Sequence, residues 1–106
     1  MIKITVYTTR NKVNGFSVKG HSHTAPHGED IVCAGVSSLA QTALLGLTEH
    51  LKRQTDYKVQ SGDLSVKLLF APDELSEAIL RTMLLGMSAI AEEYPKTVQI
   101  KMIHEG

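Results

Sequence analysis

Residues 20–39, GHSHTAPHGEDIVCAGVSSL, gather most of the side chains of this sequence that could act as a nucleophile, a base or a metal ligand near neutral pH. They contain Cys33, the only cysteine of the 106-residue chain, and three of its five histidines, His21, His23 and His27. A thiolate attacks carbonyl carbons once a neighbouring base has taken its proton. Imidazole is a common base and also a common metal ligand. The stretch therefore indicates either thiol chemistry or a metal site.

Cys33 and His21 are the best candidates for a nucleophile and its base. His21 follows a predicted strand, and Cys33 lies close to the predicted start of a helix. A loop that leaves a strand and returns as a helix can bring its two ends within the hydrogen-bond reach that a base needs. The positive end of the helix would also stabilise a thiolate. His23 and His27 lie inside the loop and are second choices.

Asp30 and Ser37 are candidates for supporting roles. The carboxylate of Asp30 can cap the predicted helix or orient His21, but a single carboxylate does not do both well. Ser37 lies one helical turn after Cys33, at i+4 spacing, so the two side chains share a helix face. The sequence does not identify the donors of an oxyanion hole.

A metal site is an alternative interpretation of the same residues. His21, His23, His27 and Cys33 follow the pattern H-x-H-x3-H-x5-C, and three imidazoles with a thiolate suit zinc chemically. The spacing matches none of the usual zinc motifs. Elemental analysis of protein purified without an affinity tag would distinguish this metal-binding protein from an enzyme.

The composition limits the other classes of function. Eleven basic residues balance eleven acidic ones, so the net charge gives no reason to expect direct nucleic-acid binding. A single cysteine cannot form an intrachain disulfide, which fits a reducing compartment. The first residues, MIKITVYTTR, alternate like a strand and show no signal peptide, and no apolar stretch is expected to span a bilayer. We therefore expect a cytoplasmic protein.

The hydrophobic pattern predicts the strands that must hold these residues. Alternation around Ile2, Ile4 and Val6 predicts a first strand, and Phe16 with Val18 predicts a second one after a turn at residues 11–15. Residues 57–70 predict two short strands around Ser61-Gly62-Asp63, and residues 98–102 predict a last strand. Tyr7, Leu69 and Ile103 are expected on a second face of the sheet, which suggests a dimer that covers it.

Apolar residues at i, i+4, i+7 spacing predict two long helices, over residues 30–53 and from Pro72 to just before Pro95. The similar segments TALLGLT (42–48) and TMLLGMS (82–88) place a glycine near the middle of each helix. Glycine costs roughly 1 kcal/mol in a helix interior, so we expect the helices to approach closely, side by side. The predicted fold is α+β: one domain over residues 1–106, a two-layer sandwich with a mainly antiparallel sheet and both helices on one face.

The motif at residues 20–39 resembles the ribosomal-processing cysteine protease family Prp. The matching residues are Gly20-His21, Gly28, Asp30-Ile31-Val32-Cys33-Ala34, Val36-Ser37 and Leu39. The chain length, the opening hairpin and the two helices fit this family from end to end. The resemblance implies a cysteine endopeptidase that removes the N-terminal extension of a bacterial large-subunit ribosomal protein during ribosome maturation. It also implies a homodimer, and it implies no cofactor.

The resemblance implies a role for individual residues as well. Cys33 is expected to be the nucleophile, His21 the base and Asp30 a helper. A mobile loop is expected over the site, and we expect the substrate to contact Ser22, His23, Gly28 and Ser37. Family members often carry an aromatic residue in this loop, in a GHAxYA-like run, and the present GHSHTAPH has none. A non-catalytic ribosome-associated module, with Cys33 as a slowly alkylated structural residue, is the remaining alternative.

Overall fold

The computed structural model describes the backbone of residues 1–20 and 27–106, and the side chains of residues 1–20 and 31–106. The elements follow in the order β1 (Ile2–Thr9), β2 (Lys12–Lys19), α1 (His27–Leu45), a π-helical turn η1 (Gly46–His50), β3 (Thr55–Gln60), β4 (Asp63–Leu68), α2 (Glu74–Glu93) and β5 (Val98–His104).

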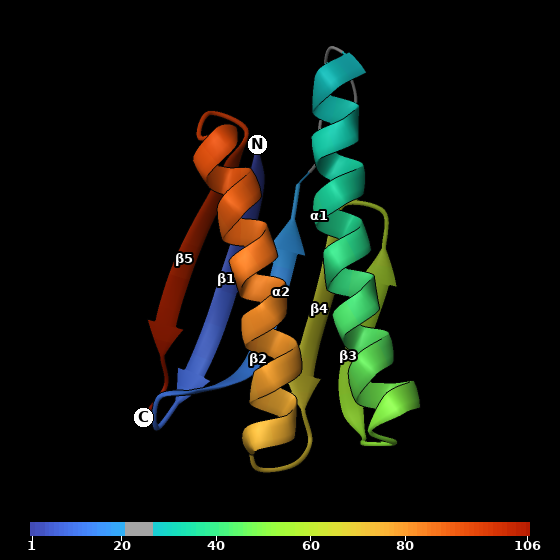
Figure 1. Cartoon of the computed structure of the whole chain (residues 1–106), viewed down its shortest axis with the longest axis vertical. Coiled ribbons are helices and arrows are strands. Elements are labelled where there is room, and N and C mark those ends of the chain that lie inside the picture. The colour runs from blue at the N-terminus through green and yellow to red at the C-terminus, as the bar shows by residue number, and fades with distance from the viewer. Residues whose placement is uncertain (21–26) are drawn as a thin grey trace.

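The strands of the described residues form one five-stranded sheet in the order β3-β4-β2-β1-β5. β1 and β5 are parallel, and every other neighbouring pair is antiparallel. Figure 1 shows α1 and α2 side by side on one face of the sheet, running in opposite directions, with α1 beside β3 and β4 and α2 beside β1 and β2. The predicted two-layer α+β sandwich is therefore confirmed.

The alternation in β1 has the predicted cause. Ile2, Ile4 and Val6 are buried on the face under the helices, and the residues between them are not. They join a single core with Phe16 of β2 and with apolar residues of both helices. This core fixes which face of each strand points toward α1, because a shift of one residue would expose the whole apolar set.

The turn of the first hairpin lies earlier than predicted. Arg10 and Asn11 form it with positive φ angles of 53° and 67°, as a tight two-residue hairpin turn requires. The predicted turn residue Gly15 is instead buried inside β2. A Cβ atom at Gly15 would lie 2.8 Å from the carbonyl oxygen of Val66 in β4, so glycine is required there by close approach of the neighbouring strand.

The helices differ from the prediction mainly at the two ends of α1. α1 begins at His27, so the prediction that Asp30 is the N-cap is wrong, and Cys33 lies in the second turn rather than the first. Proline has no N–H to donate inside a helix, and the helix starts directly after Pro26. The helical segment ends with η1, and Lys52, with a φ of 56°, follows it. Lys52 and Arg53 thus lie beyond the last helical turn.

The glycines in the two helices have the role predicted for them. A Cβ atom at Gly46 would lie 3.1 Å from Cδ1 of Ile79 in α2. A Cβ atom at Gly86 would lie 3.0 Å from Cδ1 of Leu39 in α1. Each helix therefore offers a glycine to a branched side chain of the other, which lets the two helices pack closely across the sheet.

The helical segment that carries Cys33 is more apolar than predicted from the sequence. Residues Ile31–His50 form a helix long and apolar enough, by length and composition alone, to cross a membrane, so the expectation that no stretch reaches that length is wrong. The structure gives another reason for this composition. Val32, Val36, Ala43 and Leu47 are buried, and they belong to the same core as β1 and β2.

Candidate functional site

A groove of 580 Å³ opens between α1 and the hairpin of β3 and β4. Its helical wall is formed by Cys33, Ala34, Val36, Ser37 and Gln41, and its other walls by Ile2, Val18, Gly20, Val59, Gln60, Ser61, Gly62, Asp63 and Leu64. The volume lies in the range of small-molecule binding pockets, and the mixture of apolar and polar walls is typical of such sites. A short peptide segment would fit a groove of this size.

Cys33, Ser37 and Gln41 line the groove because they recur at i+4 spacing on one face of α1. Cys33 is partly exposed and packs against the core on its inner side. Ser37 accepts a hydrogen bond from the side-chain amide of Gln41, with 2.8 Å between Oγ and Nε2. The predicted pair of Cys33 and Ser37 is therefore brought together in one site.

Gly20 fixes the chain at the wall of the groove opposite Cys33. Its φ of 89° ends β2, and its N–H donates to the carbonyl oxygen of Gly62 at 3.0 Å. A Cβ atom at this position would lie 2.3 Å from the carbonyl oxygen of Met1, so no other residue fits here without moving the backbone. The residue that precedes His21 and the thiol of Cys33 thus line the same groove.

Most of the other residues predicted for the site lie outside the part of the chain that the structure describes. His21, Ser22 and His23 belong to residues 21–26, as does most of the predicted loop over the site. The prediction that His27 and the next two residues lie in this loop is wrong, because α1 begins at His27. Gly28 and Asp30 lie among residues 27–30 at the start of α1, and the side chains of these four residues are not described. Their predicted roles therefore remain predictions.

The sequence did not predict that the hairpin of β3 and β4 forms a wall of the groove. Ser61 and Gly62 were assigned to a turn, and the structure confirms the turn between β3 and β4. Their contribution to the groove follows from the pairing of β4 with β2, which carries this turn to the end of β2 where Gly20 lies. Gln41 could have been found, because it continues the i+4 series from Cys33.

One charged pair lies beside the hairpin wall. Lys58 of β3 and Asp63 of β4 form an ion pair with 2.6 Å between Nζ and Oδ2. The hydrogen bond from Lys58 lowers the pKa of the Asp63 carboxyl from its ordinary value, and the charges of Lys58 and Lys19 act in the same direction. Asp63 is therefore ionised and already partnered, so it is a poor candidate for a proton acceptor at the thiol.

Helix geometry gives the thiol little help. The field of a helix dipole falls off within the first turn, and Cys33 lies in the second turn of α1. A thiol at this position would therefore need a neighbouring base to become a good nucleophile. Within residues 1–20 and 31–106, no group of three or more histidine, cysteine, aspartate or glutamate side chains could hold a metal ion. The histidines of the alternative metal site lie outside those residues.

Comparison of the sequence with known proteins identifies a family. A model of the family described as cysteine protease Prp matches residues 1–99. The ribosomal processing cysteine protease Prp of Staphylococcus aureus (strain NCTC 8325 / PS 47) is 31% identical over 103 residues, which cover 92% of this chain and 96% of the relative.

Two solved structures share the fold over nearly the whole chain. A crystal structure of a Streptococcus mutans protein has a TM-score of 0.88 at 24% identity, and the match covers 99% of this chain and 96% of the other. A crystal structure of the essential ribosomal processing protease Prp from S. aureus with a substrate peptide has a TM-score of 0.87 at 23% identity, covering 96% of this chain and 99% of the other.

Proposed function

This chain belongs to the cysteine protease Prp family and is a cysteine endopeptidase, and we propose that it removes the N-terminal extension of a bacterial large-subunit ribosomal protein during ribosome maturation. The family match spans residues 1–99, and the curated relative is a ribosomal processing protease. The observation in this chain that carries the proposal is the groove in which a partly exposed cysteine lies opposite the end of β2.

In the proposed mechanism, Cys33 is the nucleophile and His21 is the base. The imidazole of His21 takes the proton of the thiol, and the thiolate attacks the carbonyl carbon of the scissile peptide bond. The imidazolium then gives its proton to the leaving amine, which leaves a thioester on Cys33. Water hydrolyses the thioester with the imidazole again acting as base. Asp30 is proposed to orient the imidazole.

The pairing of Cys33 with His21 is supported by the position of Gly20. Gly20 lines the groove together with Cys33, and its hydrogen bond to Gly62 fixes the backbone from which His21 continues. The required glycine conformation at this point sets the direction in which the chain leaves β2.

The substrate is proposed to lie along the groove in an extended conformation. β3 is an edge strand, so its outer backbone groups are open to an added strand. Ser37 and the side chains of Gln41 and Gln60 supply polar contacts along the groove walls. Ser22, His23 and Gly28 are proposed to contact the substrate from the segment between β2 and α1.

Alkylation by iodoacetamide as a function of pH tests the pairing. Wild-type Cys33 should be labelled at pH values where an ordinary thiol is protonated, because a neighbouring imidazole favours the thiolate. His21→Ala should lose this labelling at neutral pH and keep it at high pH. His50→Ala is the matched control, since His50 is exposed on η1 and does not line the groove. Identical profiles for wild type and His21→Ala would rule out the pair.

Cleavage of a peptide that spans the extension of the ribosomal protein tests the activity itself. Mass spectrometry should find a single cut in the wild-type reaction and none with Cys33→Ala. His21→Ala should lose nearly as much activity, because members of a catalytic unit act together. A Cys33→Ala protein that still cleaves would exclude thiol catalysis. Wild-type protein that labels normally but leaves the peptide intact would exclude the proposed substrate alone.

We also propose that the protein acts as a homodimer in the cytoplasm. Large apolar side chains are exposed on the helical layer, and Leu85 of α2 is 72% exposed while Ile31 of α1 is 62% exposed. A second copy would bury such side chains at little electrostatic cost. Light scattering should give twice the mass of one chain, and Leu85→Gln should shift the equilibrium toward the monomer. A monomeric wild-type protein at micromolar concentration would exclude the dimer.

A further inference from the structure

The face of the sheet turned away from the helices carries an array of lysines. The register places Lys58, Ser65, Ser17, Thr5 and Lys101 in one row that crosses all five described strands. One neighbouring row contains Lys3 and Lys19, and the row on the other side contains Lys67. All five lysines are exposed. We call Lys3, Lys19, Lys58, Lys67 and Lys101 the lysine face.

Few acidic side chains balance the lysine face. Asp56 and Asp63 are the acids in the three rows of the described strands: Asp56 lies opposite Lys67, and Asp63 lies opposite Lys19 and is paired with Lys58. Many of the remaining acids belong to the helical layer, where Glu49, Glu74, Glu92 and Glu93 are exposed. The net charge of zero therefore hides a separation of charge between the two faces of the molecule.

The arrangement of two lysines works against the stability of the sheet. Lys3 and Lys19 are directly opposite each other on β1 and β2. Side chains in this position approach to within about 5 Å at Cβ, and like charges there are destabilising. Asp63 lies opposite Lys19 on β4 and the charge of Lys19 lowers its pKa, so the sheet offsets part of this repulsion and a bound anion would offset the rest.

A hollow of 450 Å³ lies within the lysine face. Tyr7, Gly15, Lys19, Lys58 and Lys67 contribute to its lining. Gly15 is opposite Tyr7 in the register, and because glycine has no side chain, the space beside the tyrosine ring stays open. The acids Asp56 and Glu105 also line it, so the hollow combines an aromatic ring with three lysines and two acids.

We propose that this face binds single-stranded RNA, with phosphates on the lysines and a base stacked on Tyr7. A cationic surface combined with an accessible aromatic ring is how single strands are bound without base pairing. The choice of RNA rather than another polyanion rests on the proposed function, in which the substrate is a protein of the ribosome. The expectation that nucleic acid does not bind came from the net charge, which does not describe this face.

A second copy of the chain fits the lysine face poorly. Two sheets stacked through it would bring the five lysines of one copy against those of the other, at a cost in like-charge repulsion. Of the three apolar residues expected to need a cover, Leu69 lies beyond the end of β4, and Tyr7 and Ile103 are neighbours among polar side chains. The face is thus suited to a polyanion rather than to dimerisation.

Fluorescence anisotropy with a labelled oligoribonucleotide of about 12 nucleotides tests the proposal on the full chain. With Lys58 paired to Asp63, four lysines are left to contact phosphates. Four contacts with a single strand predict that affinity falls about 50-fold between about 50 and 200 mM salt. Lys67→Gln/Lys101→Gln should bind more weakly, and its affinity should fall only about 7-fold over the same range.

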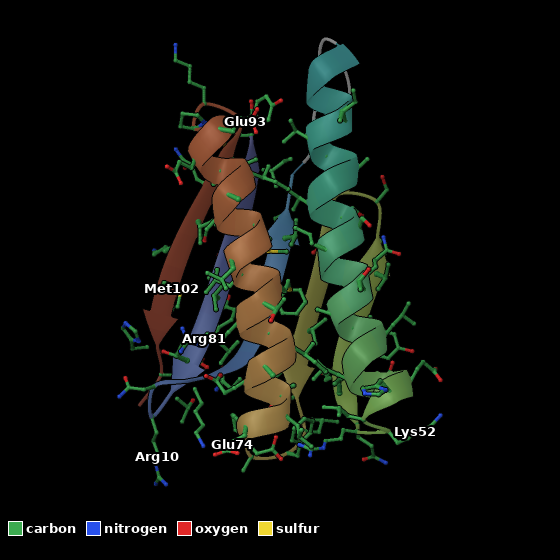
Figure 2. The ribbon with its side chains drawn as sticks, in the orientation of Figure 1. Arg10, Lys52, Glu74, Arg81, Glu93 and Met102 are labelled. Carbon is green, nitrogen blue, oxygen red and sulfur yellow. The ribbon has the colours of Figure 1, made fainter. Side chains whose placement is uncertain are left out.

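Two matched controls test whether RNA binding needs the lysine face rather than any exposed positive charge, and an aromatic ring rather than any bulky side chain at position 7. Lys52→Gln/Lys96→Gln removes the same charge from exposed sites outside the strands and should leave binding unchanged; Figure 2 shows Lys52 at the end of the helical layer. Tyr7→Phe should bind RNA like wild type, whereas Tyr7→Leu should lose at least about 5-fold because only the first keeps a stacking ring.

The outcomes decide the proposal independently of proteolysis. Equal losses in the two lysine pairs, or RNA binding too weak to measure at low salt, would overturn it. A single-stranded DNA of the same length that binds tighter than RNA would also overturn the choice of RNA. Cys33→Ala should bind RNA normally, and Lys67→Gln/Lys101→Gln should still cleave the peptide, so the failure of either proposal can be recognised while the other stands.

Discussion

Glu77 joins α2 to the first hairpin, and its removal should destabilise the fold by a predictable amount. One carboxylate oxygen accepts the backbone N–H of Val13, and the other accepts from Nε of Arg81 at 3.1 Å. Arg81 in turn donates to the carbonyl oxygen of Asn11 at 2.8 Å. Figure 2 shows Arg81 on α2 and Arg10 of the hairpin turn toward the same end of the molecule.

The magnitude follows from burial. Val13 is 1% exposed, so when Glu77 is replaced by alanine the N–H of Val13 loses its acceptor and has little access to water as a replacement. A hydrogen bond to a charged acceptor contributes about 1.5–3 kcal/mol, and the partly exposed pair with Arg81 adds less than about 0.5 kcal/mol. We expect Glu77→Ala to cost about 2–3 kcal/mol. Glu77→Gln keeps an acceptor for Val13 and should cost about 1 kcal/mol.

Urea unfolding followed by circular dichroism measures both costs, with an unchanged m-value showing that only stability has changed. Glu92→Ala is the control, because it removes an exposed acid from the other end of α2 and should change stability by less than about 0.5 kcal/mol. Equal costs for the alanine and glutamine variants would refute the reasoning, since the acceptor at Val13 would then contribute nothing.

Two further predictions concern the sheet. Lys58 holds the pKa of Asp63 below its ordinary value of 3.8, so the pair stabilises the fold above that pH and the stabilisation is lost as the pH falls through the lower folded-state pKa. The urea midpoints of wild type and Lys58→Gln should therefore differ at neutral pH and converge in acid. A difference that persists in acid would contradict this. Gly15→Ala should lower the free energy of unfolding by about 1–3 kcal/mol in the same assay, because its Cβ would meet the Val66 carbonyl at 2.8 Å. Gly86→Ala should cost less, because its Cβ meets a movable leucine side chain and alanine has the higher helix propensity. The reverse order would be inconsistent with the packing.

Several features of this protein were determined locally and could be predicted from the sequence. The alternation of Ile2, Ile4 and Val6 predicted β1, because burial of one face repeats every second residue in any strand. The apolar spacing after Pro72 predicted α2, whose N-terminus Asp73 caps by accepting from the N–H groups of Leu75 and Ser76. Cys33 was the clear candidate nucleophile because the chain has no other cysteine.

Other features depend on which strands become neighbours, and local patterns do not contain this information. Gly15 was taken for a turn because Asn14-Gly15 is a strong turn signal, yet β4 approaches it too closely for a side chain. The turn at Ser61-Gly62 became a wall of the groove only because β4 pairs with β2 and brings it to Gly20.

The separation of charge is the clearest example of a property decided by tertiary structure. The sequence fixes the number of charges, and their sum is zero. Lysines scattered from Lys3 to Lys101 meet on one face because the pairing of five strands aligns their registers, and alternation turns them all away from the helices. Composition counts charges without regard to position, whereas a ligand responds to the field of the charges that lie close together in space.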